Sequence, residues 1–169
     1  LFGYVNNKPI KLFASVWDKP SVDFMAQYTN IMKIGSASIS DLELCKYARD
    51  KSDTLLISTG MSTEKEIEEC IAVCDPNVIM HTNSTYPTPV KELNLNYIKW
   101  LLNKWKNKEI GYSGHEYGLV TTFATVALGC SWIERHLTLD RTMWGSDQRA
   151  SVEPQGFIKL VKGIRDIES

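Results

Sequence analysis

The sequence has almost no net charge and no long hydrophobic run. Its 19 lysines and arginines nearly balance its 20 aspartates and glutamates, so the formal net charge is -1. This balance argues against a nucleic-acid partner and against an anionic membrane surface. The apolar runs are far shorter than the roughly 18 residues of a membrane span, and the N-terminus lacks a charged region followed by an apolar core. We therefore expect a cytoplasmic protein with no membrane partner.

Cysteine is also scarce, with four residues in the chain. Cys45 and Cys130 are isolated, whereas Cys70 and Cys74 are four residues apart in a helix-like segment. That spacing puts both thiols on one helix face but suits a disulfide poorly. We expect free, buried or half-buried thiols.

What the sequence does contain is a repeated strand-then-helix pattern, in 169 residues of which 43% are hydrophobic. Residues 1–11 carry turn signals and are expected to form an incoming loop. Short apolar runs predict six strands, and capped amphipathic segments predict a helix after each. The expected strands are 12–16, 31–34, 54–57, 78–80, 109–113 and 132–137. The expected helices are 22–28 capped by Ser21, a helix through Ala48 capped by Ser40 or Asp41, one begun at Ser62 or Thr63, 95–105, 120–128 and 153–167.

Six such units at intervals of about 20 to 30 residues predict a parallel sheet covered by helices. An open doubly wound sheet and a (β/α)8 barrel both satisfy the pattern. The sequence has neither G-x-G-x-x-G nor GxxxxGK[ST], so the dinucleotide fingerprint and the P-loop are absent. Polar residues end almost every expected strand, as they do at the mouth of a barrel. We therefore expect an α/β fold, an incomplete (β/α)8 TIM barrel of about six units.

Two of the three histidines end successive strand-like runs. Alternation along a strand puts Ser113 and His115 on one face and Glu134 and His136 on one face. Two imidazoles beside a carboxylate are the composition of a metal site that keeps positions open for a substrate. We expect His81, which lies earlier in its strand, to be a packing residue or a support for the site.

Lys33 lies within the second expected strand. A lysine in a parallel strand is costly to bury unless an anion pairs with it. Exposure at a frayed strand is the alternative, but Ser36, Ser58 and Ser113 could supply further donors at the same strand ends. The pattern favours a site for a phosphate or a carboxylate.

Six segments now combine into a resemblance. They are KIGS (33–36), STGM (58–61), HTNSTYPTP (81–89), GYSGHE (111–116), ERHLTLDR (134–141) and GSDQRASVEP (145–154). In their order and spacing they resemble the N-acetylneuraminate (sialic acid) synthase family. That family condenses phosphoenolpyruvate with an N-acetylated hexose, typically N-acetylmannosamine, in a metal-dependent (β/α)8 barrel followed by an antifreeze-like domain. The resemblance implies that residues 1–169 form part of the barrel domain and that the antifreeze-like domain is absent from this chain.

The resemblance also implies roles for single residues. His115 and His136 would bind a divalent metal, usually manganese, with Mg²⁺ or Co²⁺ as alternatives. Lys33, Ser36, Ser58 and Ser113 would hold phosphoenolpyruvate, and Ser84, Tyr86 and Asp147 would face the sugar. Glu134 would act as the acid or base near the reacting carbons. The substrates would be small molecules, and the full-length protein is expected to be a homodimer.

The sequence departs from the family pattern at three positions. Gly114 replaces a common aspartate, which removes a carboxylate that could support the metal site. Gln148 replaces a histidine found in many members, and Ser84 stands where the family has asparagine. Two alternatives stay open: a related phosphoenolpyruvate-dependent 3-deoxy-sugar-acid synthase, and an inactive barrel fragment.

Overall fold

The computed structural model describes residues 1–5 and 7–169, over which strands and helices alternate. Within that range each of six strands is followed by a helix, and strands that are neighbours in the sequence are neighbours in the sheet. The β1–β2, β2–β3 and β5–β6 pairs are all parallel. A strand and its crossover helix form the repeating unit of a (β/α)8 barrel, so the expected fold class is confirmed. The chain divides into two compact units, Leu1–Ile79 and Met80–Ser169.

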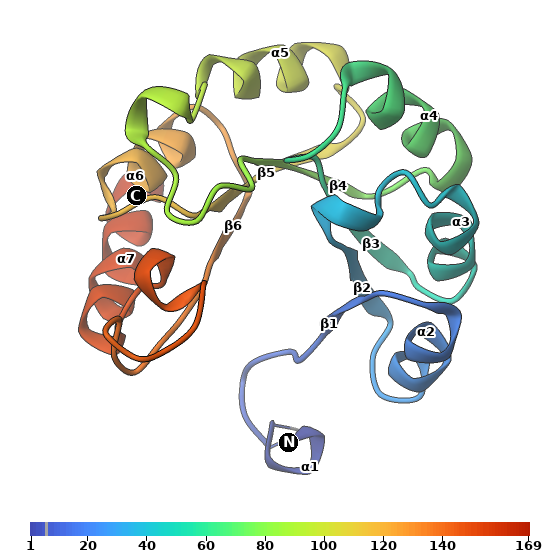
Figure 1. Ribbon diagram of the computed structural model, residues 1–169, viewed down its shortest axis with the longest axis horizontal. Helices are drawn as coiled ribbons and strands as arrows, with labels where there is room; N and C mark the ends of the chain where they lie inside the picture. Colours follow the sequence, from blue (N-terminus) through green and yellow to red (C-terminus); the bar gives the residue numbers. More distant parts are fainter. Residues whose placement is uncertain (6) are drawn as a thin grey trace. The chain divides into compact units, whose positions relative to one another are not determined.

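The first unit packs a row of helices beside parallel strands (Figure 1). Its elements are α1 (Phe2–Val5), β1 (Ala14–Val16), α2 (Lys19–Ala26), β2 (Ile31–Ile34), the 3-10 helix η1 (Ser36–Ser38), α3 (Leu42–Asp50), β3 (Thr54–Ser58) and α4 (Glu64–Cys74). Ile34 and Ile57 are paired in the sheet register and fully buried. Leu44 on α3 and Ile67 on α4 are also buried, so apolar side chains on the strands and helices form one core.

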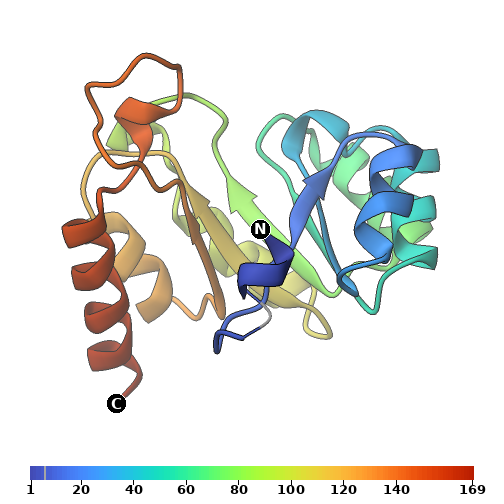
Figure 2. The same cartoon turned by 90° about the horizontal axis from the view of Figure 1, so that it is seen from below.

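The second unit begins inside β4 and ends with the longest helix it contains among the described residues (Figure 2). Its elements are β4 (Val78–Thr82), η2 (Val90–Glu92), α5 (Asn96–Lys104), β5 (Glu109–Gly114), α6 (Val120–Ala127), β6 (Trp132–Arg135), η3 (Gln148–Ala150) and α7 (Pro154–Glu168). Helices α6 and α7 lie side by side. Buried Ile110, Tyr112, Ile98 and Leu101 pack β5 against α5.

Side-chain caps explain where the helices of the first unit begin. Asp41, one of two expected caps, accepts a hydrogen bond from Leu44 N at 3.0 Å. Thr63 begins α4 in a reciprocal capping box with Glu66. The expectation that Ser21 caps the first long helix was wrong. Asp18 caps α2, and Ser21 is three residues inside it, where its hydroxyl accepts from the Asp18 backbone N–H.

Other boundaries differ from expectation by a few residues. The expected loop at residues 1–11 contains the short helix α1. Strand β4 extends to Thr82, which places His81 within it, and β6 ends at Arg135, so His136 immediately follows the strand. All four cysteines are free and buried, as expected, with the sulfurs of Cys70 and Cys74 3.6 Å apart. No helix in the described ranges is long and apolar enough to cross a membrane.

Candidate active site

The two histidines of the predicted site lie together in the second unit. The register of β5 and β6 pairs Ser113 with Glu134, and alternation carries both strands on to His115 and His136 on that face. The two imidazole rings are 5.0 Å apart between centroids and nearly perpendicular, at 87°. The expected juxtaposition of these histidines at adjacent strand ends is therefore confirmed, while their role stays a prediction.

The ring nitrogens of the two histidines have different surroundings. His115 is 3% exposed, and its Nδ1–H donates to the Asn83 carbonyl oxygen at 2.7 Å. A carbonyl only accepts, so Nδ1 of His115 carries a hydrogen in this bond. The ring of His136 lies between two carboxylates, with Nε2 3.8 Å from Glu134 Oε1 and Nδ1 3.5 Å from Asp147 Oδ2. The site thus combines an imidazole held by a backbone hydrogen bond with one that lies beside two carboxylates.

Glu134 is bonded to the hydroxyl of its partner in the register. Ser113 Oγ, on a residue only 2% exposed, donates to Glu134 Oε2 at 2.5 Å. The Glu134 side chain remains 34% exposed. A carboxylate with one oxygen on a hydroxyl and the other facing an imidazole can take or give a proton at that second oxygen.

Tyr86, from the loop that follows β4, packs its ring at a tilt against both imidazoles. Its ring centroid is 4.1 Å from that of His115 and 5.6 Å from that of His136. Burial raises the pKa of Tyr86 above its usual value, and the charges of Asp147 and Glu134 act in the same direction. Its phenol therefore stays protonated at neutral pH and can donate a hydrogen bond.

Ser84 and Asp147 occupy the loops around this cluster. Ser84 is half-buried two residues before Tyr86. Asp147 is exposed and immediately precedes η3, where its Oδ1 accepts from the Ser146 hydroxyl at 2.7 Å. Gln148 accepts a hydrogen bond from Thr138 Oγ1. Its amide is thereby held against the loop beside Asp147.

The donor set fits a divalent ion in part. Among the residues described here, no cluster of three or more His, Cys, Asp or Glu side chains is arranged to hold a metal. Two imidazoles are present, however, and the bond from His115 Nδ1 to the Asn83 carbonyl is the arrangement that orients a metal-ligating histidine. His115 and His136 could hold an ion whose other positions are taken by substrate or water.

A buried ionic network behind the histidines was missed by the sequence analysis. Glu116 is fully buried, and its Oε1 accepts from Arg135 Nη1 at 3.1 Å. Arg135 Nη2 also donates to the Glu116 carbonyl at 2.6 Å. Tyr112, Thr121 and Thr122 donate their hydroxyls to the same carboxylate at 2.7 to 2.9 Å. The network joins the ends of β5 and β6, one residue beyond His115 and one before His136.

The same network explains Gly114. A Cβ at this position would lie 2.6 Å from Glu116 Oε2 and 2.6 Å from Tyr112 Cε1, so no side chain fits. The space beside Gly114 that a carboxylate there would enter already holds the carboxylate of Glu116. The effect of Gly114 on metal affinity stays a prediction, since the printed bonds of the Glu116 carboxylate run to Arg135 and three hydroxyls.

Lys33, Ser36 and Ser58 lie in the first unit. The register places Lys33 opposite Leu56, and alternation puts Ser58 on that same face of the sheet. Lys33 is half-buried. Ser58 is 2% exposed, and its hydroxyl has no hydrogen-bond partner among the residues described. Ser36 Oγ accepts from Gly60 N at 3.1 Å.

This arrangement suits an anion, because a lysine and an unsatisfied buried hydroxyl share one face. Ser113 and the histidines belong to the other unit. The predicted convergence of both groups on one pair of substrates therefore stays a prediction.

Strand-end polar residues on six βα units are typical of a (β/α)8-barrel enzyme. The whole chain, residues 1–169, matches the NeuB family. The chain belongs to that family. It is 37% identical over 161 residues to N-acetylneuraminate-9-phosphate synthase of Drosophila melanogaster, covering 92% of this chain and 43% of the relative. It is 35% identical over 167 residues to N,N'-diacetyllegionaminic acid synthase of Campylobacter jejuni, covering 94% and 50%.

Solved structures of other synthases have a similar fold. The crystal structure of N-acetylneuraminic acid synthetase from Leptospira borgpetersenii, in complex with citrate, superposes with a TM-score of 0.91 at 32% identity, over 96% of this chain and 58% of that one. A truncated 3-deoxy-D-arabino-heptulosonate 7-phosphate synthase from Thermotoga maritima has a TM-score of 0.79 at 15% identity, over 98% and 68%, and shares the fold alone. The chain spans about half the length of the curated relatives it matches.

Proposed function

We propose that the protein containing this chain condenses phosphoenolpyruvate with an N-acetylated hexose, such as N-acetylmannosamine, to give a nonulosonic acid and phosphate. The observation that carries the proposal is the cluster in which Tyr86, from the loop after β4, meets His115, His136 and the Ser113–Glu134 pair at the ends of β5 and β6. It lies in a chain that belongs to the NeuB family.

Phosphoenolpyruvate would be bound by the anion-binding residues. The Lys33 ammonium would pair with its phosphate or carboxylate, and the hydroxyls of Ser36 and Ser58 would donate to its oxygens. The Ser113 hydroxyl, predicted to join them, instead donates to Glu134. The buried, unpartnered hydroxyl of Ser58 supports this assignment, because a ligand oxygen would satisfy it. A lysine used this way binds by charge and forms no covalent bond with the substrate.

The sugar would lie against Tyr86, Ser84 and Asp147. The protonated phenol of Tyr86 and the Ser84 hydroxyl can donate to sugar or N-acetyl oxygens, while the exposed carboxylate of Asp147 can accept from sugar hydroxyls. A divalent ion, with manganese the first choice and Mg²⁺ or Co²⁺ as alternatives, held by His115 and His136 would supply Lewis-acid polarisation of the sugar aldehyde.

The proposed reaction forms one carbon–carbon bond and releases phosphate, and it needs no oxidant or reductant. C3 of phosphoenolpyruvate forms a bond to the aldehyde carbon of the open-chain sugar, and the aldehyde oxygen gains a proton. Water adds at C2, and the C2–O bond to phosphate breaks to leave the ketone of the product. Glu134 Oε1, which faces His136, would take the proton from that water, while Ser113 holds Oε2 at 2.5 Å.

The relatives are named after different products, which suggest different acceptor sugars. They include synthases for N-acetylneuraminate-9-phosphate, N,N'-diacetyllegionaminic acid and pseudaminic acid. The acceptor is thus a phosphorylated or an unphosphorylated N-acetylated sugar, and mass spectrometry of the product distinguishes them. By resemblance we propose a cytoplasmic homodimer for the intact protein, which sedimentation at several concentrations tests.

The deciding experiment measures phosphate release by the intact protein given manganese, phosphoenolpyruvate and a panel of N-acetylated hexoses. We expect sugar-dependent phosphate release, reduced by about 100-fold or more in Glu134→Gln, because a positioned acid or base contributes on that order. Glu168→Gln, at an exposed glutamate on α7, should retain the wild-type rate.

Other outcomes favour the alternatives. Release only with an aldose phosphate would favour a 3-deoxy-sugar-acid synthase. No release with any acceptor would sink the proposed activity and favour an inactive barrel.

A further inference from the structure

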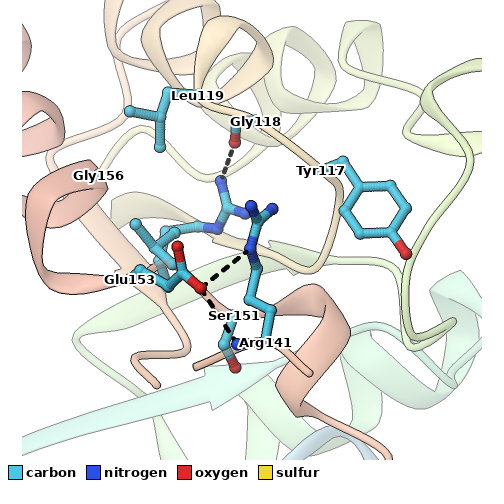
Figure 3. A pocket seen from close by; sticks show the side chains of 9 residues that line it. Tyr117, Gly118, Leu119, Arg141, Ser151, Glu153 and Gly156 are labelled. Atoms are coloured by element: carbon cyan, nitrogen blue, oxygen red, sulfur yellow. Dashed lines mark hydrogen bonds and ion pairs between the residues drawn. The ribbon is translucent and has the colours of Figure 1, made fainter. Parts of the chain in front are cut away.

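A cavity lies in the second unit, on the opposite face of β6 from the histidine cluster. It has a volume of about 130 Å³, several times what one water molecule needs. Its wall comes from the segment after β5, from β6, and from the segment after β6 that leads into α7: Tyr117, Gly118, Leu119, Arg135, Arg141, Ser151, Val152, Glu153 and Gly156 (Figure 3). Arg135 lies between Glu134 and His136, so alternation directs its side chain away from theirs.

Arg135 provides a buried, unsatisfied donor in this wall. Its side chain is 1% exposed, and both terminal nitrogens are engaged: Nη1 by Glu116, Gly118 and Thr122, and Nη2 by the Glu116 carbonyl. Its Nε–H, by contrast, is buried without a partner in the part of the chain that the structure describes. Leaving a charged group's donor unpaired costs free energy that an oxygen ligand would recover.

Arg141 adds a second guanidinium. Figure 3 shows it facing Glu153, whose Oε1 is 3.7 Å from Arg141 Nε and accepts from the Arg141 backbone N–H at 3.2 Å. Glu153 therefore occupies one edge of the guanidinium. Neither terminal nitrogen of Arg141 has a hydrogen-bond partner in the described ranges, and together they match the geometry of an oxyanion.

The first turn of α7 supplies main-chain donors. Helix α7 has 15 residues, and Glu153 before it makes no side-chain cap. The N–H groups of Gln155 and Gly156 therefore have no acceptor from within the helix, and Pro154 has no N–H to offer. Gly156 forms part of the cavity wall without a side chain of its own. The start of the helix, through Glu153 and Gly156, thus lines the same cavity as the two arginines.

We propose that this cavity binds a small oxyanion of the phosphate class, held by Arg141, Arg135 Nε and the first-turn amides of α7. The charge of the buried Arg135 is balanced by Glu116. Glu153 is the one carboxylate among the lining residues, and its repulsion of an anion keeps the affinity of the site low. The anion ties Arg141 to α7. It thereby steadies the segment between His136 and Val152, whose two ends are already joined by the bond from Val152 N to the His136 carbonyl at 2.7 Å. That segment carries Asp147.

Binding is tested by titrating the isotopically labelled chain with sodium phosphate against sodium chloride of equal ionic strength, using inorganic phosphate as the probe. Saturable shifts should appear at the amides of Gln155 and Gly156 and at Arg141 Nε–H, and hydrogen exchange in residues 139–150 should slow. Sulfate should produce the same shifts, whereas chloride should not. None of these readouts depends on the proposed activity.

Phosphate binding by variants distinguishes this site from non-specific attraction of anions to surface arginines. Arg141→Met should weaken phosphate binding by about tenfold or more, because a charge-assisted contact is lost. Glu153→Gln should strengthen it several-fold by removing the competing carboxylate. Arg165→Met, at an exposed arginine on the same helix, should bind like the wild type, and Arg141→Lys should be intermediate. The absence of saturable shifts, or equal losses in Arg141→Met and Arg165→Met, would overturn the proposal.

Discussion

At the scale of single residues, the most informative position is one that lacks a side chain. Gly114 looks like the loss of a carboxylate, but the carboxylate of Glu116 fills the same space and is held by Arg135 and three hydroxyls. A buried ion pair of this kind adds little stability compared with apolar packing, but breaking it is costly. We infer that it fixes the ends of the two strands that carry the histidines.

Restoring an aspartate at position 114 should therefore be harmful. Gly114→Asp would force a Cβ to within 2.6 Å of Glu116 Oε2 and add a second carboxylate to a closed network. We expect a loss of about 3 kcal/mol or more in the free energy of unfolding, measured by urea denaturation. Adding Glu116→Ala to Gly114→Asp should recover part of it. Gly3→Asp, where a Cβ would have nothing within 4 Å, is the control. Wild-type stability in Gly114→Asp would contradict this account.

His81 gives the chain a predictable dependence on pH. Burial lowers its pKa from the ordinary value of 6.5, while the bond from Nε2–H to the Leu93 carbonyl at 2.7 Å acts in the opposite direction. The unfolded chain therefore takes up a proton at a higher pH than the folded chain does. Stability from His81 is complete above pH 6.5 and is lost as pH falls toward the lower folded value.

Replacing this histidine should flatten that dependence. We expect His81→Gln to show a shallower fall of unfolding free energy on acidification below pH 6.5 than the wild type. Urea denaturation at a series of pH values measures it. Thr82→Val, which changes no titrating group, should keep the wild-type slope. An unchanged slope in His81→Gln would show that other groups control the acid response.

The residues of the site were predictable to different degrees. Alternation in two strands is enough to bring His115, His136 and Glu134 to one face, because register and a period of two are local properties. The bond between Glu116 and Arg135 depends on how β5 and α6 pack against β6, which no spacing in the sequence reveals. The signal available in the sequence was a charged residue next to each predicted histidine ligand, Glu116 after His115 and Arg135 before His136. Alternation along the strand directs Arg135 away from the histidine cluster.

At the scale of elements, side-chain hydrogen bonds to the first turn determine where a helix begins when residue propensity alone allows two positions. Ser40 and Asp41 both suit the position before α3, and the sequence does not choose between them. In the structure Asp41 accepts from Leu44 N, whereas Ser40 is exposed and contributes its backbone carbonyl to a turn. The end of β6 differs from the expected one because a strand ends where its pairing ends. The last pair between β5 and β6 joins Gly114 to Arg135.

The cap assignment makes a matched pair of variants. Asp41→Ala should lower the free energy of unfolding by about 1 kcal/mol, because the first turn of α3 loses a hydrogen bond and a favourable charge. Ser40→Ala should change it by less than about 0.5 kcal/mol. Thermal and urea denaturation of both variants measure the difference. The reverse order would show that Ser40 is the cap in solution.

At the scale of the whole molecule, the order of six βα units could be read from the sequence because each strand and helix carries its own periodicity and punctuation. What local patterns do not reveal is the placement of the anion-binding residues of the first unit relative to the histidine cluster of the second. A bound ion, by contrast, acts on the stability of the folded state as a whole, so metal binding can be tested without activity.

Manganese should raise the free energy of unfolding of the chain, because an ion that binds the folded state alone stabilises it by mass action, by about 2.7 kcal/mol at a concentration 100 times its dissociation constant. The increment should disappear in His115→Gln and His136→Gln, which lose one imidazole of the pair 5.0 Å apart. His81→Gln removes a buried histidine whose Nε2 bonds to the Leu93 carbonyl, so it should lower stability yet keep the increment. Thermal denaturation with and without manganese measures all four proteins. An increment of equal size in every variant would place the metal elsewhere, and no increment in the wild type would mean that two imidazoles alone do not retain the ion.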